Sequence, residues 1–256
     1  MSLRNRLSSR ELAAMGVFTA FVAVATMVVS ANVAATGGYF NIGETMVYTA
    51  ALLMGPVVGA FAGGIGSMIS DVALGYAVFA PGTLVIKGAE GFIVGYLAQY
   101  RFNSPSKTRV TVLAVISGMI LALVIWWGGT SFFTGDIDFT LGIAPSTLIF
   151  TLAVPELFWI VLAVAAFLLV TIAGVYLDPQ ISWLVFVILL GGAEMVVGYY
   201  FYERYVMGQV LATAEILVNI GQVIVGLIVS IPLTRSIARI MPRNLKRQPT
   251  SAVQTE

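Results

Sequence analysis

Long apolar runs, separated by short breaks of polar residues, glycine or proline, dominate the pattern of this chain. A helix needs about 20 predominantly apolar residues to cross a bilayer, and most of the runs reach that length. We therefore predict an all-α, polytopic membrane helical bundle with about eight transmembrane segments. The runs lie near residues 11–31, 42–54, 57–76, 83–100, 109–128, 145–174, 181–202 and 210–234.

The run near 42–54 is too short to cross a bilayer as a straight helix. Its sequence, IGETMVYTAALLM, extends about 20 Å at a helical rise of about 1.5 Å per residue. A Gly55-Pro56 pair separates it from the next run. Short segments interrupted by Gly and Pro are typical of helices that line a binding cavity in a membrane protein.

The composition places the whole chain, residues 1–256, in a single integral membrane domain. Hydrophobic residues make up 59% and charged residues 10% of it, whereas an average soluble domain has about 25% charged residues. Cys and His are absent, which excludes disulfides and removes the commonest metal ligand and general base. The phosphate-binding pattern G-x-x-x-x-G-K-[ST] is absent as well. We expect no catalytic residue, no metal site, no cofactor and no enzymatic activity.

Basic residues gather near both ends of the chain and in one internal loop. Cytoplasmic loops of membrane proteins carry an excess of Lys and Arg, so we expect a multi-pass protein of the cell membrane with both termini cytoplasmic. Asp136 and Asp138 lie in a loop on the predicted opposite side. We interpret the N-terminal run as a retained helix and residues 242–256 as a disordered cytoplasmic tail. The basic residues are Arg4, Arg6, Arg10, Arg101, Lys107, Arg109, Arg235, Arg239, Arg243, Lys246 and Arg247.

Four ionisable residues, Glu44, Asp71, Lys87 and Glu90, lie inside the second, third and fourth runs. Ionisable groups at membrane depth usually pair with one another and mark a substrate or ion path. Lys87 is the one basic residue within these apolar runs. We therefore expect a buried ion pair between Lys87 and Asp71, or between Lys87 and Glu90, which either holds two helices in register or takes part in function.

A second polar cluster lies in the last run. Glu215, Asn219 and Gln222 are spaced i, i+4, i+7, which places them on one face of a helix. Their polar counterpart is a ligand, water or a neighbouring helix. Tyr76 and Tyr199 lie near the predicted outer mouth, where an aromatic ring either stacks on a ligand or belongs to the interfacial aromatic belt.

Four sequence patterns in these runs together resemble a known family. The second run holds Gly43-Glu44, the glycine-rich third run ends in Ser70-Asp71, the fourth reads KG-x-EGF-x-x-G, and the last contains AE-x-x-x-N-x-x-Q. These patterns resemble the S components of energy-coupling factor (ECF) vitamin transporters, especially their riboflavin-type branch. The resemblance covers about 150 residues in two blocks and implies a six-helix core, residues 11–100 and 181–234.

The resemblance also implies a ligand pocket in the outer half of the membrane, covered by the loops after the first and third runs. The residues that it implies for substrate binding are Glu44, Tyr76, Lys87, Glu90, Tyr199, Glu215, Asn219 and Gln222.

Members of this family dock through small residues of the first helix onto a transmembrane coupling subunit. The resemblance therefore implies as partners the ECF transmembrane coupling subunit and two ATPase subunits, together with a vitamin ligand and membrane lipid but no nucleic acid. The corresponding small residues are Ala13, Gly16, Ala20 and Ala23.

This chain is longer than the six-helix pattern of the family. We expect residues from about 105 to 175 to form an inserted helical hairpin between the fourth helix and the penultimate one.

The function that the resemblance implies is vitamin capture. A substrate-specific component of an ECF-type ABC importer binds a B vitamin or vitamin precursor at the outer face, with riboflavin as the first expectation, and an ATP-driven partner complex delivers it inward. The alternative is an ion-coupled secondary transporter of a small polar solute, with Asp71, Glu90 or Glu215 as its ion site.

Overall fold

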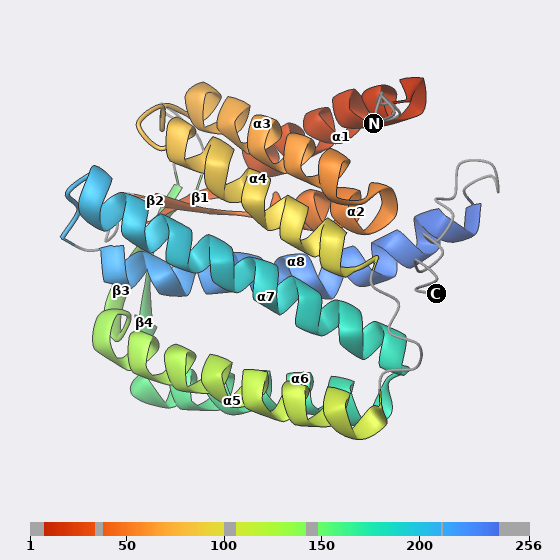
Figure 1. Ribbon diagram of the computed structural model, residues 1–256. Helices are drawn as coiled ribbons and strands as arrows, with labels where there is room; N and C mark the ends of the chain where they lie inside the picture. Colours follow the sequence, from red (N-terminus) through yellow and green to blue (C-terminus); the bar gives the residue numbers. More distant parts are fainter. Residues whose placement is uncertain (1–7, 34–37, 100–105, 142–147, 211, 241–256) are drawn as a thin grey trace.

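The computed structural model of the protein describes residues 8–33, 38–99, 106–141, 148–210 and 212–240, and α-helices predominate in it (Figure 1). The predicted disordered tail, residues 242–256, lies outside this range. The helices are α1 (Ser9–Val28), α2 (Glu44–Met54), α3 (Pro56–Leu74), α4 (Ala80–Leu97), α5 (Lys107–Phe132), α6 (Glu156–Tyr176), α7 (Pro179–Phe201), the π-helical turn η1 (Tyr202–Val206) and α8 (Ala212–Ile240).

Six helical stretches in the described part of the chain are long and apolar enough to cross a membrane: α1, α3, α5, α6, α7 together with η1, and α8. These helices confirm the predicted all-α, polytopic membrane bundle. The short helix α2 has 11 residues, and α4 carries both Lys87 and Glu90. Neither of these two belongs to the six, so the count of eight crossings stays a prediction.

A small antiparallel sheet at one end of the bundle was not predicted. Its strands are β1 (Ser30–Val33), β2 (Gly38–Asn41), β3 (Gly135–Leu141) and β4 (Leu148–Val154), in the order β2-β1-β3-β4. The prediction of one helical run over 145–174 was therefore wrong in its first part. Its opening residues, LIFTLAV, are rich in β-branched and aromatic types that favour strands, and α6 begins only after Pro155.

The N-terminal half of the bundle is tightly packed. Helix α3 lies against α4 and α1, and α2 lies against α8. Glycine permits the close approach of α3 to α4, because a Cβ atom on Gly64 would lie 2.6 Å from the carbonyl oxygen of Leu84. Small residues at helix interfaces allow this kind of backbone contact in membranes.

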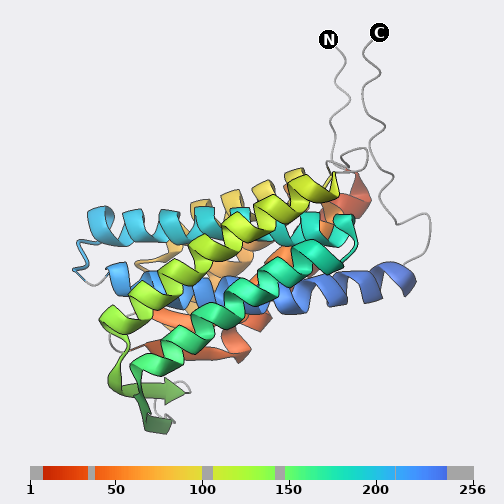
Figure 2. The ribbon, with the colours of Figure 1, turned by 90° about the horizontal axis from the view of Figure 1, so that it is seen from below.

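Helices α5 and α6 pack mainly on each other and form a separate layer beside α7 and α8 (Figures 1 and 2). Two apolar cavities lie along this boundary. One, of about 420 Å³, lies between α6, α8 and the sheet, and the other, of about 520 Å³, lies between α5, α7 and α8. The segment predicted as an inserted hairpin contains the helices α5 and α6. The two strands between them in the chain, β3 and β4, join the sheet.

The two ends of the bundle differ in charge. The beginnings of α1 and α5 and the end of α8 lie at one end, whereas the sheet, the α3–α4 turn and η1 lie at the other (Figure 1). The basic residues of the first end are Arg10, Lys107, Arg109, Arg235 and Arg239.

Candidate functional site

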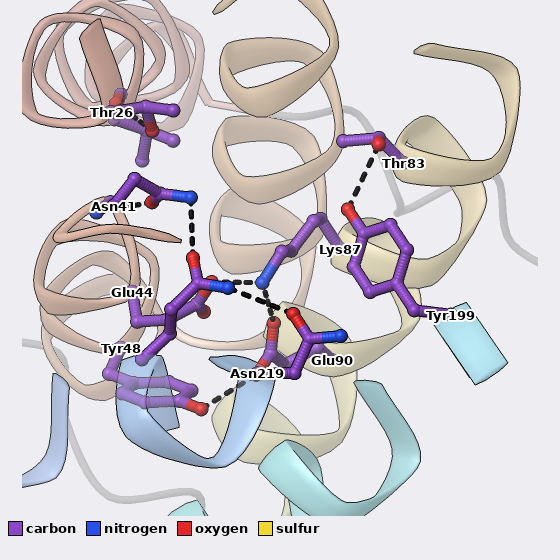
Figure 3. A network of polar contacts seen from close by, with 12 residues as sticks. Thr26, Asn41, Glu44, Tyr48, Thr83, Lys87, Glu90, Tyr199 and Asn219 are labelled. Carbon is purple, nitrogen blue, oxygen red and sulfur yellow. Dashed lines mark hydrogen bonds and ion pairs between the residues drawn. The ribbon is translucent and has the colours of Figure 1, made fainter. Parts of the chain in front are cut away.

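Lys87 of α4 is the centre of a buried ionic cluster (Figure 3). Its Nζ contacts Glu44 of α2 and lies 3.3 Å from Oε2 of Glu90, one turn further along α4. The hydroxyl of Tyr48 donates a hydrogen bond to the other Glu90 oxygen, Oε1, at 2.6 Å. One ammonium group therefore faces two carboxylates from two helices, in surroundings where an unpaired charge would be strongly unfavourable.

Asp71 does not form the predicted ion pair with Lys87. The hydroxyl of Tyr39, in β2, donates instead to Oδ1 of Asp71 at 2.6 Å. The reason is the alignment of α3 with α4: the Lys87 backbone lies against Gly63, eight residues or about 12 Å along α3 from Asp71. The expected alternative pair, Lys87 with Glu90, is present.

Tyr39 is suited to act as the donor in this contact. Burial, followed by the charge of the Asp71 carboxylate, raises the pKa of Tyr39 well above the ordinary value of a phenol. The side chain therefore keeps its proton across the physiological range and holds β2 against the end of α3.

A narrow polar cavity lies between β2, the adjoining ends of α3 and α4, the end of α7 with η1, and the first turns of α8. Its volume is about 30 Å³, whereas pockets for vitamin-sized molecules usually measure about 300–1,000 Å³. A ligand of that size requires the walls to move apart. The lining residues are Gly38, Tyr39, Asn41, Asp71, Phe79, Thr83, Lys87, Tyr199, Glu203, Glu215, Asn219 and Gln222.

Amide side chains form one wall of this cavity. Nε2 of Gln222 donates to Oδ1 of Asn219 at 2.8 Å, within α8. Nδ2 of Asn41 donates to Oε1 of Gln222, and Oδ1 of Asn41 accepts from the backbone N–H of Gly43 at 2.8 Å. The network links the start of α2 to α8 and orients the amides of α8 along the cavity.

Aromatic side chains form the opposite wall and the cover. The Tyr199 hydroxyl donates to Oγ1 of Thr83 at 2.9 Å, and Nζ of Lys87 lies 5.6 Å from the centre of the Tyr199 ring. Beside the cavity, the ring of the lining residue Tyr39 stacks on that of Tyr76 with their centres 4.5 Å apart. Aromatic faces beside polar groups suit a ligand that is itself partly aromatic.

The sequence of this chain matches the model of a known protein family. The model described as "ECF-type riboflavin transporter, S component" matches residues 6–181. The chain belongs to this family. The S components are transporter subunits, which agrees with the bundle of membrane-spanning helices.

A curated relative of this S component comes from Pyrococcus woesei and is described as "Uncharacterized protein in gap 3'region". The two sequences are 42% identical over 102 residues, which cover 40% of this chain and 66% of that protein.

The matched range contains the ionic cluster but only part of the cavity. Glu44, Asp71 and Lys87 fall within residues 6–181, whereas Tyr199 and the polar residues of α8 fall beyond them. The range also runs through α5 and α6.

The S component brings five of the eight predicted substrate-binding residues into the cavity lining. The other three lie next to it: Glu44 and Glu90 contact Lys87, and Tyr76 stacks on Tyr39. The five lining residues are Lys87, Tyr199, Glu215, Asn219 and Gln222.

The sequence reasoning missed several lining residues. Tyr39 and Asn41 belong to the connection after the first run, which the resemblance implied as a cover, so the residues just before Gly43-Glu44 were a usable signal. Phe79 lies in the other implied cover, where its ring, like that of Tyr76, was expected near the outer mouth. Thr83 lies one helical turn before Lys87 on α4, which the i, i+4 spacing could have indicated. Glu203 had no such signal, because it lies beside exposed Arg204 in a run without clear periodicity.

The predicted docking residues of α1 divide between two faces of the helix. Ala13, Gly16 and Ala20 are exposed, and a Cβ on Gly16 would meet no atom within 4 Å. Ala23 is buried instead, and its carbonyl oxygen accepts a hydrogen bond from Ser70 of α3 at 3.1 Å. Ala23 is therefore not exposed with the other three predicted residues, because α3 covers it.

Proposed function

We propose that this S component binds a B vitamin or vitamin precursor from the outer side of the cell membrane and delivers it inward with an ATP-driven partner complex. The polar cavity carries this proposal, because polar and aromatic side chains from β2 and five helical segments converge on it. Riboflavin is the first compound to test, since the family is named for it.

The charge distribution supports an outward-facing cavity. The basic ends of α1, α5 and α8 lie together at one end of the bundle, and by the positive-inside rule this end faces the cytoplasm. The cavity lies at the opposite end, beside the sheet and the α3–α4 turn. Both termini are then cytoplasmic.

Ligand entry requires the cover of the cavity to move. Tyr39 of β2 and Phe79 of the α3–α4 turn contribute to its lining, and Tyr76 stacks on Tyr39. Both segments lie at the ends of helices rather than within them. Their outward movement opens the cavity without separating α3 from α4.

Delivery requires a partner, and α1 offers a surface for one. Ala13, Gly16 and Ala20 present small side chains on its exposed face, which allows another membrane helix to approach closely. The proposed partners are the ECF transmembrane coupling subunit and, through it, two ATPase subunits.

Ligand binding to the purified protein tests this proposal. We expect one compound among riboflavin, thiamine, its pyrimidine precursor, pyridoxine and biotin to bind with submicromolar affinity in a tryptophan-fluorescence titration. Asn219→Ala should weaken that binding about tenfold or more, since a ligand or protein group that loses a buried hydrogen-bond partner costs about 1–3 kcal/mol.

The matched control is Ile228→Ala on the same helix, at a side chain that is 49% exposed, and it should bind as the wild type does. If no compound in the panel binds, the proposed function is wrong.

The buried Glu44, Lys87 and Glu90 cluster favours a second candidate, an ion-coupled secondary transporter of a small polar solute. Uptake in cells separates the two. Vitamin uptake that survives a proton uncoupler and requires the ATPase subunits supports the S-component function, whereas ion-dependent uptake by the protein alone in liposomes supports the alternative.

A further inference from the structure

The cavity lining has an excess of acidic groups. Asp71, Glu203 and Glu215 contribute carboxyl groups, and Lys87 is the single basic residue among the lining residues. The Lys87 ammonium already faces two further carboxylates, those of Glu44 and Glu90. The Lys87 ammonium is therefore shared between two further carboxylates, and acidic residues outnumber basic ones in the cavity lining.

Glu203 enters the cavity through an unusual local structure. It lies in the π-helical turn η1, a wider turn that occurs frequently at functional sites. Glu203 is 1% exposed, whereas its neighbours Arg204 and Tyr205 are exposed. The turn thus directs the adjacent guanidinium group outward, as solvation favours, but the carboxyl group inward, where it loses its hydration.

One oxygen of Glu203 is available for a ligand. Its Oε2 is buried and has no hydrogen-bond partner among the described residues, and the same holds for Oδ2 of Asp71. Buried carboxylate oxygens normally have hydrogen-bond partners, because a buried acceptor without one loses its hydration and gains nothing in return. Both oxygens belong to residues that line the cavity.

Glu215 brings a second carboxyl group to the same place. It lies in the first turn of α8 and lines the same cavity as Glu203. Its side chain also lies against Gly38 of β2, where no Cβ would fit. Two carboxyl groups from separate helical segments therefore line one cavity, and that of Glu215 lies against β2.

We infer that the ligand of this S component carries a positive charge, and that Glu203 and Glu215 form the subsite that binds its cationic group. This inference rests on the proposed function and narrows it to vitamins or precursors with a protonated amine or a quaternary ring nitrogen. Asp71 lies on the same lining and adds negative charge, and the Phe79 and Tyr199 rings offer apolar faces for the rest of the ligand. A neutral or anionic ligand leaves Oε2 of Glu203 and Oδ2 of Asp71 without a cationic partner in a region of low polarity.

The decisive experiment compares ligands that differ in charge but not in shape. Calorimetric titration of the full-length wild-type protein uses thiamine, which has a cationic ring, and 3-deazathiamine, its neutral isostere, together with pyridoxamine as a protonated amine, neutral riboflavin and anionic biotin. We expect a cationic compound to bind most tightly, and thiamine to bind at least tenfold more tightly than 3-deazathiamine if thiamine is that compound. This comparison needs no variant and so does not depend on the folding of one.

Glu203→Gln then tests the residue itself. It should weaken binding of the cationic compound at least tenfold and leave any weak binding of neutral compounds unchanged. Arg204→Gln, which changes the adjacent exposed charge, is the matched control and should bind as the wild type does. The melting temperature of each variant shows whether it is folded.

The possible results separate this inference from the proposed function. Tightest binding of riboflavin or biotin overturns the cationic subsite and leaves the vitamin-binding function standing. Equal binding of the cationic compound by wild type and folded Glu203→Gln also overturns the subsite. An absence of binding by every compound overturns the proposed function and the subsite together.

Discussion

At the scale of single residues, the arrangement of buried charge defines this protein. Lys87 contacts Glu44 and Glu90, and Tyr48 supplies a further hydrogen bond to Glu90. Placing these groups next to one another removes most of the penalty that each would carry alone at membrane depth. The cluster therefore depends on all of its members being present.

Lys87→Met should destabilise the protein strongly, because it leaves two carboxyl groups buried without their ammonium partner. Breaking a buried ion pair in this way costs about 3–5 kcal/mol. The measurement is the free energy of unfolding of the detergent-solubilised protein. Val85→Met, on the same helix at a side chain that is 68% exposed, is the control and should change that free energy little.

Removing the two acidic charges should partly rescue the variant. The triple change Lys87→Met, Glu44→Gln and Glu90→Gln should recover much of the lost free energy, since neutral amides carry a smaller burial penalty. Equal stability of Lys87→Met and the Val85→Met control would show that the carboxyl groups carry no charge in the folded protein.

At the scale of elements, the contact between α3 and α4 determines where the charged side chains meet. A Cβ atom added to Gly64 would lie 2.6 Å from the carbonyl oxygen of Leu84, which is too close for any side chain. The resulting alignment places Lys87 beside Gly63, and Asp71 accepts a hydrogen bond from Tyr39 instead. A change in the spacing of these helices would therefore disturb the ionic cluster and the cavity together.

Gly64→Ala should destabilise the protein by about 1–3 kcal/mol, because its Cβ forces the two helix backbones apart. Gly88→Ala is a matched control on α4, in the same interface, where the added Cβ would lie 3.6 Å from the nearest atom, the carbonyl oxygen of Ala60. The control should be neutral or slightly stabilising, since Ala favours a helix over Gly. Thermal unfolding in one detergent compares them, and similar losses for both variants would contradict the close contact.

At the scale of the whole molecule, the protein has a basic end and an opposite end that holds the sheet and the cavity. The separation follows from the antiparallel course of the helices, which returns the start of α5 and the end of α8 to the end where α1 begins (Figures 1 and 2). From the positive-inside rule we expect the end that holds the cavity to face the outside.

Single-cysteine labelling tests this orientation directly, because the chain contains no cysteine of its own. Asp136→Cys, at the exposed start of β3, should react with a membrane-impermeant maleimide on intact cells. Ser9→Cys and Ser106→Cys, both exposed at the basic end, should react only after the membrane is made permeable. The reverse pattern would place the cavity on the cytoplasmic side.

The amino-acid sequence alone was sufficient to predict the properties that depend on local pattern. The apolar runs identified a membrane bundle, because a bilayer requires long apolar helices. The spacing of Glu215, Asn219 and Gln222 placed them on one face of α8, because helical geometry alone determines which residues share a face. All three line the cavity.

Only the tertiary structure decided which distant groups meet. Lys87 is 43 residues from Glu44 in the chain, and their contact depends on how α2 and α4 pack. Asp71 meets Tyr39 because β2 folds over the end of α3, and Glu203 points inward because η1 turns the chain. Contacts between separate elements depend on the packing of the whole bundle. The periodicity within one segment does not predict that packing.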